Sequence, residues 1–186
     1  MPVALHRAIP LAAFANLKLS RETNAIALPS PGIQPMTSLQ DDLAASLAEK
    51  LRQASAEMQL RPIRIFDVGV FPWHESLELS FFCEGDEDDE KSGGDRAYED
   101  DVASWPLYNF SAMEEGEWQS AEPICAVLST QWESQEPNLV PMLQLVVQAL
   151  KSEPVQQALS QLPQAADFRI QVLDPDDPES PNYYES

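Results

Sequence analysis

Histidine and cysteine, the residue types most often used for nucleophilic and metal chemistry, are scarce in this sequence. The 186 residues contain two histidines, His6 and His74, and two cysteines, Cys83 and Cys125. A protein metal site needs several convergent ligands, and the 42 residues that separate the cysteines match neither a disulfide framework nor a metal-ligand spacing. We therefore expect both cysteines to be reduced thiols in the core, and we predict neither a metal nor an organic cofactor.

His74 and Cys83 flank one predicted strand, and they are the best candidates for nucleophilic catalysis. Such a pair also needs an oxyanion hole and a third residue that orients the histidine, and no motif marks either of these. The sequence has no G-x-S-x-G, P-loop or G-x-G-x-x-G motif, and its six glycines leave little for loops that bind phosphate. We therefore predict that the protein is not an enzyme, with a hydrolase that uses Cys83 and His74 as an alternative.

Carboxylates are the abundant ionisable groups, with 31 Asp and Glu against 11 Lys and Arg and a net charge of −20. Residues 84–101 hold ten acids and two bases, residues 110–136 hold six acids and no base, and residues 174–186 hold five acids. This charge argues against direct binding to nucleic acid or anionic membranes, because both favour clustered Lys and Arg. It favours a basic protein partner, and an acidic surface kept for solubility alone is the alternative.

Aromatic residues occur beside these acids, and Trp and Tyr are preferred anchors of protein interfaces. Trp118 stands in a polar stretch, so we expect its side chain to be exposed, whereas we expect Trp105 and Phe110 to lie in the core. If the three acidic segments converge, they form one field that steers a basic partner; separately solvated loops are the alternative. The candidate partner-binding residues are Asp86, Glu87, Asp88, Asp89, Glu90, Tyr98, Glu114, Glu115, Glu117 and Trp118.

The elements that position these residues begin with a helix and a hairpin. Thr37 and Gln40 match a capping box, and leucine recurs at every fourth position from Leu39 to Leu51, which predicts an amphipathic helix that ends near residue 59. Apolar residues alternate along 63–70 and again along 77–83. Because this period is that of a strand with one buried face, we predict an antiparallel hairpin.

The C-terminal half of the sequence changes to a helical period. Residues 124–132, 139–150 and 154–161 are expected to form helices, and the alternation along 167–173 predicts a last strand. The predicted fold is α+β, with a small antiparallel sheet packed against several helices. The hairpin at 63–83 and the strand at 167–173 form that sheet.

The predicted organisation is one domain with irregular ends. Residues 1–36 contain five prolines and are expected to form an irregular N-terminal arm, and residues 37–174 form the α+β domain. Within it, residues 84–101 lack any apolar period, so we expect a mobile acidic loop. The aromatic segment 102–110 is expected to return to the core as an edge strand or without strand structure. Residues 175–186 are expected to be a frayed acidic tail.

The layout of these elements resembles small acidic immunity proteins of bacterial polymorphic toxin systems. The resemblance covers roughly residues 38–177 and rests on the leading helix, the hairpin, the acidic insertion and the paired helices. It also rests on the stretch DDVASWPLYNFS at residues 100–111 and on the closing strand DFRIQVLD at residues 167–174. The proline-containing first 36 residues depart from a bare immunity domain and leave open an added role or a different family.

The resemblance implies a cytoplasmic protein that binds and blocks one cognate toxin, with no cofactor and no catalytic residues. Many toxins that attack nucleic acid have basic clefts, and an acidic loop with aromatic anchors can occupy such a cleft as phosphate does. The sequence alone leaves a rival function open, which is an acidic adaptor or structural component whose charge serves only solubility.

Overall fold

The computed structural model describes residues 36–88, 96–112, 118–134 and 138–186. Residues 34–186 form one compact unit. The N-terminal arm predicted for residues 1–36 lies outside the described residues, apart from Met36, which begins the first helix.

Two antiparallel strands, β1 (Ile63–Phe71) and β2 (Ser76–Cys83), form the predicted hairpin. Opposite residues such as Phe66 and Phe81 pair across it, and their side chains enter the main core. A 3-10 turn at Pro72–His74 joins the strands and ends at Glu75, whose φ of 50° lies in the left-handed region. The alternation of apolar residues therefore predicted both strands, each of which extends one residue beyond its expected limits.

The third strand, β3 (Gln164–Gln171), makes the sheet mixed, with the order β2-β1-β3. This strand runs parallel to β1, so the prediction of an entirely antiparallel sheet is wrong, although the α+β class is confirmed. The direction follows from the chain between β2 and β3, because the three helices in this stretch provide the long crossover that a parallel neighbour requires. β3 also begins three residues earlier than the predicted strand at 167–173.

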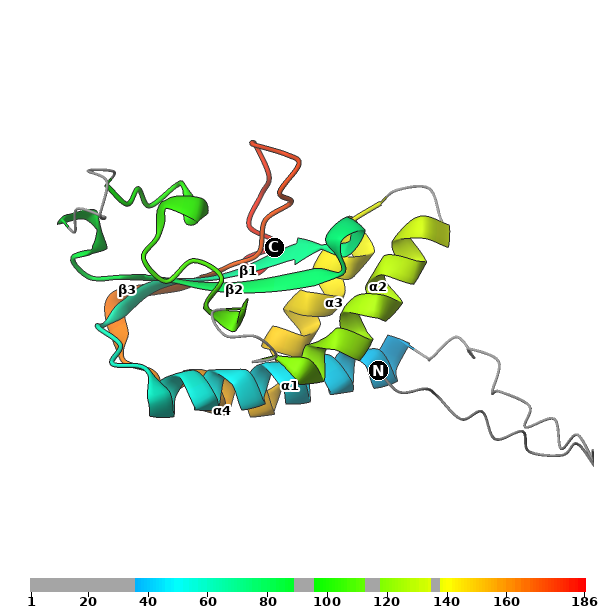
Figure 1. The fold of residues 1–186 in the computed structure, drawn as a ribbon, viewed down its shortest axis with the longest axis horizontal. Coiled ribbons are helices and arrows are strands. Elements are labelled where there is room, and N and C mark those ends of the chain that lie inside the picture. Colours follow the sequence, from blue (N-terminus) through cyan, green and yellow to red (C-terminus); the bar gives the residue numbers. More distant parts are fainter. Residues whose placement is uncertain (1–35, 89–95, 113–117, 135–137) are drawn as a thin grey trace, which may run out of the picture. The chain divides into compact units, whose positions relative to one another are not determined.

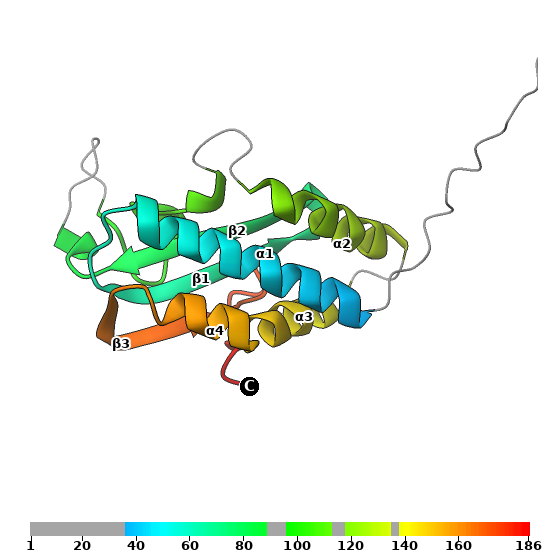
Figure 2. The ribbon, with the colours of Figure 1, turned by 90° about the horizontal axis from the view of Figure 1, so that it is seen from below.

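The helices of the described chain cover one face of the sheet (Figures 1 and 2). They are α1 (Met36–Glu57), α2 (Glu122–Ser134), α3 (Val140–Leu150) and α4 (Glu153–Leu159), close to the predicted ranges. Leu43 and Leu47 of α1 and Phe81 of β2 are fully buried. The leucine stripe of α1 therefore packs in the main core, because a helical repeat near four residues keeps these side chains on one face.

The opposite face of the sheet, called here the outer face, is covered in part by residues 96–110. Trp105 packs on Phe82 with ring centroids 5.3 Å apart, and both join Ile65 and Ala97 in a second small core. Trp105 and Phe110 are buried, as predicted. The segment forms short 3-10 turns and two isolated bridges, Leu107 with Phe81 and Tyr98 with Asp101, which fits the expectation of little strand structure.

The C-terminal tail is attached to β3, so the prediction that residues 175–186 fray is wrong. The Asn182 side chain donates to the carbonyl oxygen of Ile170 at 2.8 Å and accepts from the backbone N–H of Val172 at 3.1 Å. Tyr183 donates its backbone N–H to the carbonyl oxygen of Val172, and its ring packs against the main core. These contacts order the tail despite its acidic composition.

Candidate functional site

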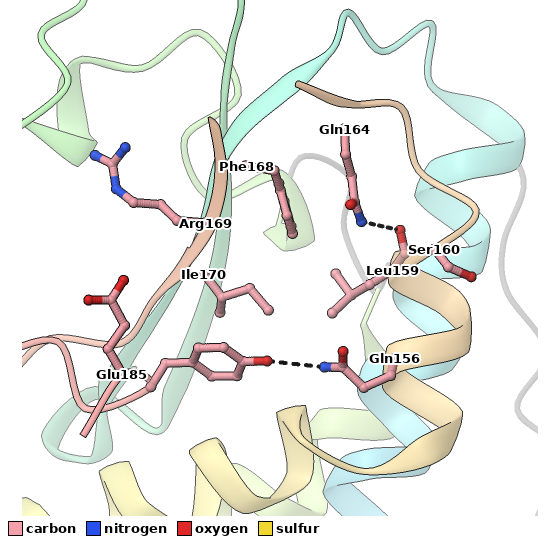
Figure 3. Close-up of a pocket in the computed structure, with 9 residues that line it drawn as sticks. Gln156, Leu159, Ser160, Gln164, Phe168, Arg169, Ile170 and Glu185 are labelled. Atoms are coloured by element: carbon pink, nitrogen blue, oxygen red, sulfur yellow. Dashed lines mark hydrogen bonds between the residues drawn. The ribbon is translucent and has the colours of Figure 1, made fainter. Parts of the chain in front are cut away.

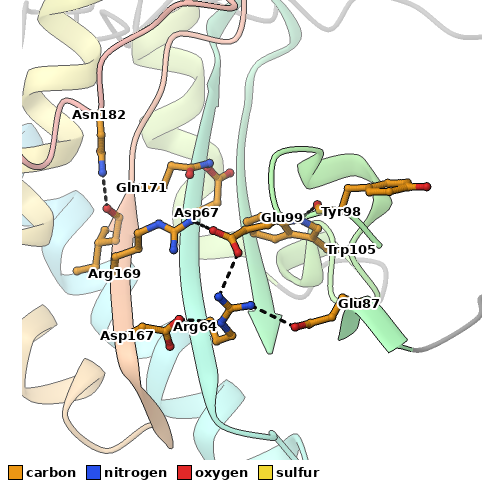
Figure 4. Close-up of polar contacts among 11 residues, drawn as sticks. Arg64, Asp67, Glu87, Tyr98, Glu99, Trp105, Asp167, Arg169, Gln171 and Asn182 are labelled. Atoms are coloured by element: carbon orange, nitrogen blue, oxygen red, sulfur yellow. Dashed lines mark hydrogen bonds and ion pairs between the residues drawn. The ribbon is translucent and has the colours of Figure 1, made fainter. Parts of the chain in front are cut away.

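Glu99 lies between two arginines on the outer face of the sheet (Figure 4). Its carboxylate accepts from Arg64 Nη2 at 3.1 Å and from Arg169 Nη2 at 2.5 Å. Arg64 belongs to β1 and Arg169 to β3, and the parallel register pairs Ile65 with Arg169, which brings the two guanidinium groups together. The acidic segment is thereby tied to two strands of the sheet.

Arg64 is the centre of this cluster. Its Nε donates to Asp167 Oδ2 at 2.8 Å, and its Nη1 contacts Glu87 Oε1 at 3.4 Å. Its guanidinium also lies 5.7 Å from the centre of the Phe82 ring, which adds a cation–π contact. The hydrogen bond between Arg64 and Asp167 raises the pKa of the arginine and lowers the pKa of the carboxyl, since each charge stabilises the other.

Residues 97–105, called here the Tyr98 turn, have a closely connected backbone. Trp105 Nε1 donates to the carbonyl oxygen of Tyr98 at 2.8 Å, and Ser104 Oγ accepts from the backbone N–H of Tyr98 at 2.8 Å. The same carbonyl oxygen accepts from the N–H of Asp101, and the hydroxyl of Ser104 donates to the carbonyl oxygen of Asp101. Buried Trp105 and ion-paired Glu99 therefore hold the turn at both ends of its exposed part.

The turn presents an aromatic side chain among carboxylates. Tyr98 is 58% exposed, the largest exposure of any large hydrophobic side chain in the described residues, and its ring points away from the sheet (Figure 4). Asp100 and Asp101 follow it, are exposed, and make no ion pair within the described part of the chain. An aromatic residue on a preorganised turn loses little further conformational entropy when it is buried by a partner.

The structure brings together two of the predicted partner-binding residues. Tyr98 lies next to Glu99, and Glu87 reaches the same Arg64 that binds Glu99. Asp88 lies in a 3-10 turn that begins at Asp86. Five other predicted residues lie outside the described residues: Asp89, Glu90, Glu114, Glu115 and Glu117.

Asp86 was predicted to belong to the partner-binding surface, but its side chain is only 1% exposed. Its Oδ2 accepts from the backbone N–H of Cys83 at 2.7 Å, and its Oδ1 pairs with Arg61. This carboxylate closes the end of β2 instead of facing a partner. The prediction that residues 84–101 form a mobile loop is therefore wrong at Asp86.

The expectation that the Trp118 side chain is exposed is also wrong. Its ring is half-buried and packs against the main core, although its sequence neighbours are polar. Its indole Nε1 is buried and has no hydrogen-bond partner in the described structure. Tyr98 is therefore the more exposed of the two predicted anchors.

The residues that sequence reasoning missed are the basic half of the cluster, Arg64 and Arg169, together with Glu99 and Asp167. A signal was present, because Arg169 stands between apolar Phe168 and Ile170 in an alternating strand. Such a position places its side chain on the face opposite to the core. The acids of this region are thus partly neutralised within the chain.

A second polar group lies farther along the outer face. Asp67 of β1 is 7% exposed and accepts from Gln171 Nε2 at 3.0 Å. Burial raises the pKa of Asp67 to about 7, and the charge of Glu78 contributes in the same direction. Tyr108 donates its hydroxyl to Glu78 at 2.6 Å, and this hydrogen bond raises the pKa of Tyr108 to about 12. Asp67 therefore changes its charge near neutral pH.

The hydrolase alternative fails on geometry. His74 precedes β2 and Cys83 ends it, so an eight-residue strand, about 25 Å long at the usual rise, separates them. Cys83 is buried, and desolvation raises the pKa of its thiol to about 12, which opposes formation of a nucleophilic thiolate. The two residues do not form a catalytic pair.

No three His, Cys, Asp or Glu side chains in the described part of the chain are placed to hold a metal ion. No helix within the described ranges is both long and apolar enough to cross a membrane. Comparison of the chain with family models, curated proteins and solved structures gives no match.

Proposed function

We propose that this chain is a binding protein of the immunity type, which neutralises a basic bacterial toxin domain by direct contact through the Tyr98 turn. The observation that carries the proposal is the exposed Tyr98 ring on a turn fixed by Trp105 and Glu99. Interface anchors are typically aromatic side chains, and the fixed backbone at Tyr98 lowers the entropy that this residue loses on binding.

The charge around the turn indicates the chemistry of the partner. Asp100 and Asp101 are exposed beside Tyr98, and the whole chain has a net charge of −20. Glu99 already binds two guanidinium groups of its own chain, so this segment is chemically suited to arginine. A basic partner surface would be attracted at long range and then held by the aromatic ring.

The proposal places the protein in the cytoplasm, where an immunity protein meets a toxin before it acts. Toxins that cleave or modify nucleic acid need a basic cleft for phosphate, and carboxylates at Asp100 and Asp101 would compete for that cleft. Tyr98 would occupy an adjacent apolar or cationic pocket. Inhibition of this kind requires no catalytic residue in the inhibitor.

The test is rescue of bacterial growth when the full chain is co-expressed with the toxin domain encoded by the neighbouring gene. We expect the native chain to restore growth, and a variant with Tyr98→Ala, Asp100→Asn and Asp101→Asn to restore it poorly. The matched control carries Asp176→Asn and Asp177→Asn, which neutralise two exposed acids in the tail. A neighbouring gene without toxin activity, or equal rescue by all variants, would contradict the proposal and favour the solubility explanation.

A further inference from the structure

An open groove of about 480 Å³ lies between α4 and β3 (Figure 3). Leu159 from the helix faces Phe168 and Ile170 from the strand, so the centre of the groove is apolar. Polar side chains from α4 and its C-terminal end, from β3 and from the C-terminal tail also line it: Gln156, Ser160, Gln164, Arg169, Tyr184 and Glu185.

The polar side chains of the groove are held in place. Gln156 Nε2 donates to the carbonyl oxygen of Leu150 at 2.7 Å and to the Tyr184 hydroxyl at 3.2 Å. Gln164 Nε2 donates to the carbonyl oxygen of Leu159 at 2.9 Å. The walls are therefore formed before any ligand arrives, which lowers the entropic cost of binding.

Among the described residues β1 is the one sheet neighbour of β3, which makes β3 an edge strand of this sheet. The C-terminal tail covers part of the free edge of β3. Asn182 binds the carbonyl oxygen of Ile170 and the N–H of Val172, and the N–H of Tyr183 binds the carbonyl oxygen of Val172. In a strand, the N–H and C=O of alternate residues point to the same edge. Phe168 therefore directs its N–H and C=O to the same edge as Ile170.

The backbone N–H and C=O of Phe168 border the groove. Within the described residues, neither group pairs with a backbone group outside the sheet. A row of unpaired N–H and C=O groups beside an apolar groove is the arrangement used to add a strand from another chain. The tail covers only the adjoining part of the edge, at Ile170 and Val172. An incoming segment would therefore meet Phe168 and the N–H of Ile170.

The charges at the groove select a basic segment. Glu185 lines it and is exposed, whereas Asp167 on β3 is paired with Arg64 and is not a lining residue. Arg169 also lines the groove, but its guanidinium is paired with Glu99. The exposed carboxylate of Glu185 favours Lys or Arg on the incoming segment.

We propose that the groove between α4 and β3 binds an extended segment of a protein partner, which adds to the sheet as a strand beside β3. An apolar side chain of that segment lies against Leu159, Phe168 and Ile170, and a neighbouring Lys or Arg approaches Glu185. This site has its own supporting observations and does not depend on the Tyr98 turn.

The first test selects binders to the full chain from a displayed library of random peptides of about twelve residues. We expect enriched peptides with apolar and basic residues in alternation and without proline at the centre. Added to isotope-labelled protein, a selected peptide should shift the backbone amide signals of Phe168 and Ile170. The proposal is overturned if no peptide binds with a Kd below about 1 mM, or if the shifts lie elsewhere.

The second test compares two exposed positions at the end of α4. Ser160→Trp fills the groove, whereas Gln161→Trp adds the same ring at a residue that does not line it. We expect Ser160→Trp to weaken peptide binding by at least about tenfold and Gln161→Trp to change it by less than about twofold. Equal affinity in both variants overturns the proposal, and amide shifts in the native chain decide the result if Ser160→Trp does not fold. Tyr98→Ala should leave peptide affinity unchanged, which separates this site from the proposed toxin surface.

Discussion

The indole Nε1 of Trp105 donates a hydrogen bond to the carbonyl oxygen of Tyr98 at 2.8 Å. One of these residues is 1% exposed and the other is 58% exposed, so the bond connects the small outer core to the exposed ring. The geometry of the proposed interface therefore depends on a residue that a partner would not touch.

Replacing Trp105 with Phe tests this connection. The variant keeps an aromatic ring on Phe82 but loses the N–H that binds Tyr98, and we expect the free energy of unfolding to fall by about 1–3 kcal/mol. Urea unfolding measures the change. Tyr98→Ala is the control and should alter stability by less than about 0.5 kcal/mol, because its ring is exposed. Similar losses in the two variants would show that the turn is not held from the core.

Asp86→Ala tests the buried carboxylate. The substitution leaves the N–H of Cys83 and Arg61 without this acceptor, and we expect a loss of about 1–3 kcal/mol in the free energy of unfolding. Glu84→Ala, at an exposed acid two residues earlier, is the matched control and should be close to neutral. An Asp86→Ala variant with an unchanged free energy of unfolding would contradict this structural role and indicate that the side chain is solvated.

Asp67 predicts a dependence of stability on pH. In the unfolded chain its carboxyl has a pKa of 3.8, and in the folded protein burial raises this pKa to about 7. Between these values the folded protein retains a proton that the unfolded chain has lost, so the free energy of unfolding falls as pH rises through this window and levels off above about pH 7.

Asp67→Asn replaces the titratable carboxyl with an amide, whose oxygen still accepts the hydrogen bond from Gln171. From about pH 4 to pH 8, the native chain should lose on the order of 2–4 kcal/mol more stability than this variant. Asp100→Asn, at an exposed acid, controls for the loss of one charge. Chemical unfolding at several pH values gives the comparison, and parallel profiles for the native chain and Asp67→Asn would disprove the assignment.

The local elements were predictable because their periods are strong. Leucines at every fourth position defined α1, and the alternation around Phe66 and Phe81 defined the hairpin. The direction of β3 was not predictable in this way. A strand with a period of two shows which side chains are buried, but its neighbour and direction depend on the path of the helices before it.

The candidate site was predictable only in part. Tyr98 was identified from its acidic neighbours, and it is exposed. Asp86 and Asp88 look equivalent in sequence, and only the distance from Asp86 to the N–H of Cys83 distinguishes the buried carboxylate. Trp118 has polar neighbours but packs on the core, because burial depends on tertiary contacts and not on adjacent residues.

The most direct test of the proposed interface is the kinetics of binding between this chain and the toxin domain of the neighbouring gene, at two salt concentrations. Tyr98→Ala should speed dissociation by at least about tenfold, which corresponds to about 1.4 kcal/mol, while association changes little. Asp100→Asn with Asp101→Asn should slow association and weaken its dependence on salt. Unchanged dissociation in Tyr98→Ala, together with unchanged association in the double variant, would contradict the account by excluding the Tyr98 turn from the interface.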